Sequence, residues 1–100
     1  SKKSVIGKWD VVEMNMGEMD TEEKEDAEKN ASIEFRSDGT YTSVDSDDTD
    51  EGNYTYNKEE RQLTITSDKH GPTNVTFSIS WEGAKMIMSG EGGSVTLRRM

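Results

Sequence analysis

The sequence predicts an all-β fold, an eight-stranded antiparallel up-and-down barrel with one short helix between strands 1 and 2. The clearest evidence is residues 73–81, where Val75, Phe77, Ile79 and Trp81 alternate with small polar side chains. A period of two is typical of a strand with one buried and one hydrated face. Short turn segments rich in Gly, Asn and Asp separate such strands at regular spacing, which favours a meander of sequential neighbours. Eight strands can close into a barrel and so remove exposed sheet edges.

The strands are expected in chain order, within a single domain that covers residues 1–100. The expected strands are residues 5–14, 33–35, the segment after a hairpin turn at 37–40, then 53–56, 62–66, 73–81, 85–89 and 94–99. The hairpin turn contains Asp38 and Gly39, because Gly accepts a positive φ and Asp can bond its own backbone. Further turns are expected at residues 57–61, 70–72, 82–84 and 90–93.

Residues 16–31 break this pattern because they are strongly acidic and carry few apolar side chains. Asp20 is a candidate N-cap with Glu23 at the third helical position, as in a capping box. Asp20 and Lys24 form a helix-supporting pair at four-residue spacing. We expect a short helix across one end of the barrel. A mobile acidic loop is the alternative, since no wide apolar stripe is present and short isolated helices hold weakly in water.

The charge and composition exclude several classes of function. The net charge of −9 argues against nucleic acid and against docking on anionic lipid, both of which require a basic surface. The chain has no Cys, so disulfides and thiolate chemistry are excluded. No apolar run approaches the length of about 20 residues that a membrane-spanning helix needs.

The residue inventory offers no catalytic set and no cofactor site. His70 is the only histidine and lies in a predicted Gly-Pro turn, without a positioned Ser and orienting acid nearby. No acid falls on the predicted inward faces, and Glu34 is expected to point outward, so no carboxyl group gains the apolar setting of a general acid. The sequence therefore predicts a protein that is not an enzyme.

One segment has the chemistry of a cation site. Residues 45–52 carry clustered carboxylates, which a hard cation such as Ca²⁺ requires. Their spacing does not fit an EF-hand loop. We therefore interpret the segment as a solvated acidic hairpin loop and predict no metal site.

The inward faces define the predicted barrel interior. The inward residues are Trp9, Val11, Ile33, Phe35, Tyr54, Tyr56, Leu63, Ile65, Val75, Phe77, Ile79, Trp81, Met86, Met88, Val95 and Leu97. An eight-stranded barrel is wide enough either to fill with side chains or to hold one small ligand. Aromatic rings with polar tips and flexible thioethers suit an adaptable apolar pocket. The ligand-binding residues would then be Phe35, Tyr54, Tyr56, Phe77, Trp81, Met86 and Met88.

An ordered set of segments resembles a known family. Gly7-x-Trp9 in the first strand is followed by residues 33–41, 52–56, 63–66 and 95–99. Together they resemble the small lipocalin-like domains of bacterial cell-envelope proteins, over nearly the whole chain apart from residues 20–29. Gly-x-Trp alone is not a specific motif, and the resemblance depends on the occurrence of all these segments in this order.

The resemblance implies a barrel that often holds an apolar small molecule. It also implies export to the periplasm or the cell surface, often as a lipoprotein, behind a signal segment removed upstream of Ser1. In lipocalins the motif Trp packs beneath an Arg of the last strand, which places Trp9 under Arg98 or Arg99. Arg99 is favoured because it shares a strand face with Leu97.

Two functions therefore remain open at this level. The first is non-catalytic binding of a small apolar or amphipathic ligand inside the barrel of an exported protein. The second is a protein-interaction or protease-inhibitor module that uses the barrel as a scaffold, with residues 1–4 as a short segment that enters the target. Fold alone does not choose between them.

Overall fold

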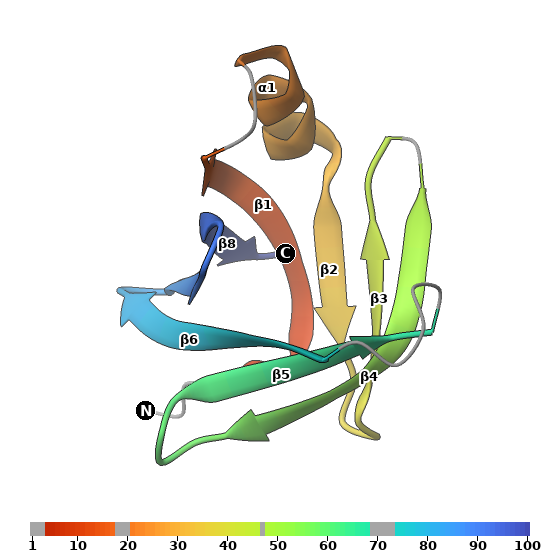
Figure 1. Cartoon of the computed structure of the whole chain (residues 1–100), viewed down its shortest axis with the longest axis vertical. Coiled ribbons are helices and arrows are strands. Elements are labelled where there is room, and N and C mark those ends of the chain that lie inside the picture. The colour runs from red at the N-terminus through yellow and green to blue at the C-terminus, as the bar shows by residue number, and fades with distance from the viewer. Residues whose placement is uncertain (1–3, 18–20, 47, 69–73) are drawn as a thin grey trace.

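The computed structural model describes residues 4–17, 21–46, 48–68 and 74–100. Its elements are β1 (Gly7–Met16), α1 (Thr21–Asn30), β2 (Ser32–Phe35), β3 (Thr40–Val44), β4 (Thr49–Asn57), β5 (Gln62–Ser67), β6 (Asn74–Glu82), β7 (Lys85–Gly90) and β8 (Gly93–Arg99). Each strand pairs antiparallel with the next, and β8 returns to β1 to close the barrel (Figure 1). The predicted fold, an eight-stranded barrel with a helix between strands 1 and 2, is confirmed.

Several predicted boundaries differ from the observed ones. The first strand starts at Gly7 instead of residue 5, because Gly7 has a φ of 134°, where the chain turns from residues 4–6 into the strand. Its pairing with β8 shifts at a β-bulge between Val11 and Glu13. The predicted N-cap Asp20 and the predicted turn at residues 70–72 lie outside the described residues.

The two ends of the barrel are built differently. In a meander, successive connections alternate between the ends of the sheet. The β2–β3, β4–β5 and β6–β7 turns therefore share one end, which we call the packed end. Helix α1 and the β3–β4 and β7–β8 turns share the other, which we call the cavity end (Figure 1).

The hydrophobic core fills the packed end. Trp9, Leu63 and Met86 have no exposed surface, and Phe35 is 1% exposed. The Phe35 ring meets the Tyr54 ring edge-on with centroids 4.9 Å apart. These large side chains occupy the lumen between the strands, so this half of the barrel interior is filled by packed side chains.

Arg99 closes the packed end over the core. Its guanidinium carbon lies 4.2 Å from the centroid of the Trp9 ring. The same guanidinium donates hydrogen bonds to the carbonyl oxygens of Ile6 (2.7 Å) and Ser4 (2.9 Å). A Cβ at Gly7 would collide with Nη1 of Arg99. Gly7 thus leaves room for the arginine that covers Trp9, which gives the Gly-x-Trp spacing a physical reason.

The neighbouring arginine points the other way. Arg98 has a side chain that is 63% exposed, and its Nη2 lies 3.9 Å from Oδ2 of Asp10. Successive side chains of a strand face opposite sides of the sheet, so only one of the two arginines can cover the barrel interior.

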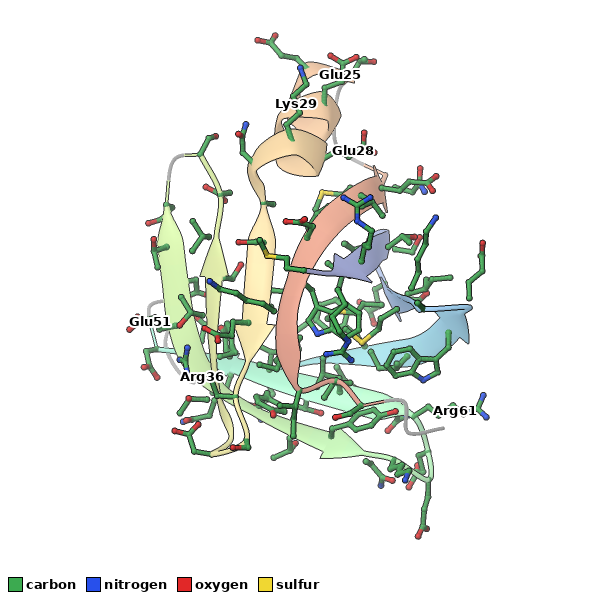
Figure 2. All side chains as sticks on the ribbon, turned by 180° about the vertical axis from the view of Figure 1, so that it is seen from behind. Glu25, Glu28, Lys29, Arg36, Glu51 and Arg61 are labelled. Atoms are coloured by element: carbon green, nitrogen blue, oxygen red, sulfur yellow. The ribbon has the colours of Figure 1, made fainter. Side chains whose placement is uncertain are left out.

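Helix α1 lies at the cavity end and is tied to β1. The Met14 amide donates a hydrogen bond of 3.0 Å to Oε2 of Glu28, and the Val11 amide donates one of 3.1 Å to the Ala31 carbonyl. Figure 2 shows Glu28 on the side of α1 nearest β1, whereas Glu25 lies on the side of the helix away from the barrel. Within the described ranges, no helix is long and apolar enough to cross a membrane.

Candidate functional site

A cavity of about 490 Å³ lies inside the cavity end of the barrel. All eight strands contribute to its wall, together with Ala31 between α1 and β2. The wall is mainly apolar, and its main apolar side chains are Val11, Ile33, Ile65, Phe77, Met88 and Val95. The cavity therefore begins where the large aromatic side chains of the packed end stop.

The cavity reaches the molecular surface. Val44 and Val75 line it, yet they are 39% and 45% exposed. Val44 ends β3 and Val75 lies near the start of β6, so both mark the mouth of the cavity on the side of β3 and β6.

Strand β4 brings one carboxylate to this wall. Its side chains alternate between the two faces, and Asp50, Gly52 and Tyr54 share the inner one. Gly52 is buried and has no side chain, so the aromatic ring of Tyr41 from β3 lies against it. Asp50 and Tyr41 are thereby brought together on the cavity wall.

Three side chains form what we call the polar corner, namely Tyr41, Asp50 and Ser67. The Tyr41 hydroxyl donates to Oδ2 of Asp50 at 2.9 Å, and the Ser67 hydroxyl donates to Oδ1 at 2.6 Å. Tyr41 is only 2% exposed. The two hydroxyl groups fix the orientation of the Asp50 carboxylate at one side of an otherwise apolar space.

The polar corner should make stability depend on pH in the alkaline range. Burial, reinforced by the hydrogen bond to Asp50, raises the pKa of Tyr41 from 10.0 to about 12. The folded state then holds the phenol proton more tightly than the unfolded state. This contribution to stability is complete below pH 10.0 and is lost as the pH rises through about 12.

We therefore expect the free energy of unfolding to fall more steeply with pH in the wild type than in Tyr41→Phe over that interval. Urea denaturation at a series of alkaline pH values measures both slopes. Because Tyr41→Phe also loses the hydrogen bond to Asp50 at every pH, only the difference in slope reports on the pKa. Equal slopes would contradict the raised pKa.

The seven residues predicted to bind a ligand do not all lie at the cavity. Phe77 and Met88 line it. The other five lie outside its lining, and they are Phe35, Tyr54, Tyr56, Trp81 and Met86. They belong to the halves of their strands next to the packed end, where they fill the lumen. Alternation in the sequence places a side chain inside the barrel but does not give its depth along the axis.

The polar corner is absent from the sequence-based predictions. Residues 45–52 were expected to form a loop, and no acid was expected to face inward; both expectations are wrong. Strand β4 begins at Thr49, so only residues 45–48 connect the strands, and Asp50 lines the cavity. The alternation of inner and outer side chains, extended from Tyr54 through Gly52 toward the start of the strand, places Asp50 on the inner face of the barrel.

Other sequence predictions fall partly or wholly outside the described structure. His70 lies outside the described residues, and so do residues 1–3 of the segment proposed to enter a protein target. Ser4 is described, and its carbonyl accepts the hydrogen bond from Arg99 at the packed end. Among the described residues, no group of three or more His, Asp or Glu side chains is arranged to hold a metal ion.

Comparisons with known proteins agree with this architecture. The sequence matches the lipocalin-like domain family over residues 5–88. Among solved structures, the chain is similar to a DUF4847-family protein from Bacteroides vulgatus, with a TM-score of 0.65, 17% identity, and coverage of 94% of this chain and 92% of that chain. At this identity the likeness shows the fold alone. No curated protein matches the chain significantly. Because the family match includes the Gly7-x-Trp9 motif and most of the barrel strands, the chain belongs to the lipocalin-like domain family.

Proposed function

We propose that the protein binds a small apolar or amphipathic molecule in the cavity and leaves it chemically unchanged. The observation that carries the proposal is the cavity of about 490 Å³ with its mainly apolar wall. Pockets for small molecules typically have volumes of about 300–1,000 Å³ and apolar linings with a few placed polar groups. Transfer of apolar ligand surface from water into such a space contributes about 25 cal/mol per Å².

The division of the barrel into two halves supports this function. An eight-stranded barrel can be filled by its own side chains or can hold one small ligand. In this chain the packed end is filled by Trp9, Phe35 and Leu63, which supply stability. The wall of the cavity end carries shorter side chains such as Val11 and Val95, which leave the space empty.

A bulky side chain placed on the cavity wall should abolish binding. We expect Val95→Trp, which fills the cavity from β8, to lower the affinity for the neutral apolar dye Nile red by about tenfold or more, because the dye loses most of its apolar contact. The measurement is the dye's fluorescence enhancement in a titration with protein. Overpacking costs about 1–3 kcal/mol, so circular dichroism must show that the variant is folded.

The adjacent residue provides the matched control. Thr96 follows Val95 on β8 and faces the outside of the barrel, so Thr96→Trp adds the same ring away from the cavity. We expect this variant to bind Nile red as the wild type does. Equal loss of binding in the two variants, or no binding by the wild type, would refute a cavity ligand.

A further inference from the structure

We propose that the cavity selects a compact apolar molecule with an alicyclic or aromatic ring system over an extended alkyl chain. The inference rests on the proposed function, and it adds the class of ligand that the cavity takes. Two features of the barrel interior carry it. They are the small depth of the cavity along the barrel axis and the layer of buried side chains that closes its inner end.

The wall of the cavity is about two layers of side chains deep. Strand β7 contributes one lining side chain, that of Met88. Strands β5, β6 and β8 each contribute two inward side chains, and these pairs are Ile65 and Ser67, Val75 and Phe77, and Val95 and Leu97. Two positions span about 7 Å along a strand, and the strands of a barrel tilt by about 40° from its axis. The two layers are therefore separated by about 5 Å along the axis.

Large side chains close the cavity toward the packed end. On five strands, the inward residue two positions beyond the last lining residue does not line the cavity and is at most 3% exposed. These residues, which we call the floor, are Trp9, Phe35, Leu63, Ile79 and Met86. Protein interiors are close-packed and contain few voids larger than a water molecule. A ligand therefore cannot extend below the floor.

The wall above the floor is stiff. Val and Ile branch at Cβ, which restricts their χ1 angles. The described lining residues of this kind are Val11, Ile33, Val44, Ile65, Val75 and Val95. Such a wall keeps its shape, so it favours a ligand whose own shape already matches the space.

A flexible chain and a ring fill such a space at different entropic cost. An alkyl chain that is longer than the cavity is deep can fold back, which costs conformational entropy. Otherwise its end stays in water, where the methylene groups gain no apolar contact. A ring molecule with the same number of carbons is already compact before it binds. The cavity of about 490 Å³ is therefore filled at lower entropic cost by a ring than by a chain.

Two alcohols with the same number of carbons test the inference on the wild-type protein. 1-Decanol is linear, whereas cyclodecanol is a ring with the same hydroxyl group. Each alcohol displaces Nile red in a titration, and its association constant is divided by its partition coefficient from water into octane, which corrects for apolar surface. We expect the corrected affinity of cyclodecanol to be about tenfold higher. Equal corrected affinities, or a higher value for 1-decanol, would overturn the inference.

A series of linear alcohols measures the depth limit that the floor sets. A methylene group that becomes buried on binding raises the affinity about fourfold. Between 1-hexanol and 1-dodecanol we expect the gain per methylene group to fall below about twofold, because the added groups remain outside the mouth. A constant gain of about fourfold through 1-dodecanol would contradict a closed floor.

Two variants on β7 assign the shape preference to the floor. Met86→Ala removes a floor side chain and opens space beneath the cavity. Ile87→Ala changes the next residue, which faces the opposite side of the sheet. We expect Met86→Ala to reduce the corrected advantage of cyclodecanol to about threefold or less, and Ile87→Ala to retain it. Equal changes in the two variants would overturn the role of the floor.

The outcomes separate this inference from the proposed function. If Nile red and both alcohols bind but cyclodecanol has no corrected advantage, only the shape preference fails. If no probe binds, ligand binding in the cavity fails as well. Should Met86→Ala not fold, the two measurements on the wild type still decide between a compact ring and an extended chain.

Discussion

Replacement of Trp9 by alanine should lower the free energy of unfolding by about 3–5 kcal/mol, the range for a large aromatic side chain lost from a core. Trp9 is completely buried, its ring centroid lies 6.2 Å from that of Trp81, and Arg99 covers it at 4.2 Å. Domains of this size are stable by about 5–15 kcal/mol, so the loss would take a large part of the total. Urea denaturation followed by circular dichroism measures it.

Two further variants make this prediction specific. The Trp9 indole nitrogen donates a buried hydrogen bond of 2.9 Å to the carbonyl of Val5. Trp9→Phe loses this donor but keeps an aromatic ring in the core. It should therefore lower the free energy of unfolding by less than Trp9→Ala does. Trp81→Ala is the matched control, because Trp81 is only half-buried and should contribute less. The prediction fails if Trp81→Ala destabilises the barrel as much as Trp9→Ala does.

Addition of a single methyl group at Gly52 should destabilise the barrel by about 3 kcal/mol, at the upper end of the range for overpacking. A Cβ at Gly52 would overlap the carbonyl oxygen of Thr66 in the neighbouring strand, and it would lie 3.0 Å from Cε1 of Tyr41. The first of these atoms belongs to the backbone of a paired strand. It cannot move aside as a flexible side chain would, so β4 and β5 must separate locally.

Gly52→Ala should also impair the cavity, because Tyr41 would be displaced from the polar corner. The test combines urea denaturation with Nile red binding. Gly17→Ala is the control, since its Cβ would meet nothing closer than the Gly92 carbonyl oxygen at 3.9 Å, and we expect a change within about 0.5 kcal/mol. If Gly52→Ala unfolds at the same urea concentration as Gly17→Ala, the close packing of β4 on β5 is not a constraint.

The period of two was sufficient to predict the barrel and most of its inner face. Ile79 and Leu97 are buried as predicted, since each lies in a strand whose neighbours two positions away are also apolar. Tyr41 was not included in the predicted inner set, although it is among the most buried side chains. Its strand carries Thr and Ser around a single aromatic residue, so no apolar alternation marks the inner face.

The location of the cavity was harder to predict than the fold. The tyrosines of β4 look like ligand contacts in the sequence, yet the Tyr54 hydroxyl donates a hydrogen bond of 2.6 Å to the Arg36 carbonyl beside the β2–β3 turn. Depth along the barrel axis depends on strand register and on which turns share an end. Strand register and the grouping of turns depend on residues far apart in the chain, so local sequence patterns do not predict them.

The seam between β1 and β8 has a consequence for the order of folding. Seven of the eight strand pairings join strands that are consecutive in the sequence. The eighth joins β1 to β8, and it places Trp9 opposite Arg99, 90 positions away in the chain. Hairpins between consecutive strands close short loops, whereas the seam must overcome the entropy of a loop almost as long as the chain. The contact between the Trp9 indole and the Arg99 guanidinium therefore stabilises the strand pairing whose formation costs the most chain entropy.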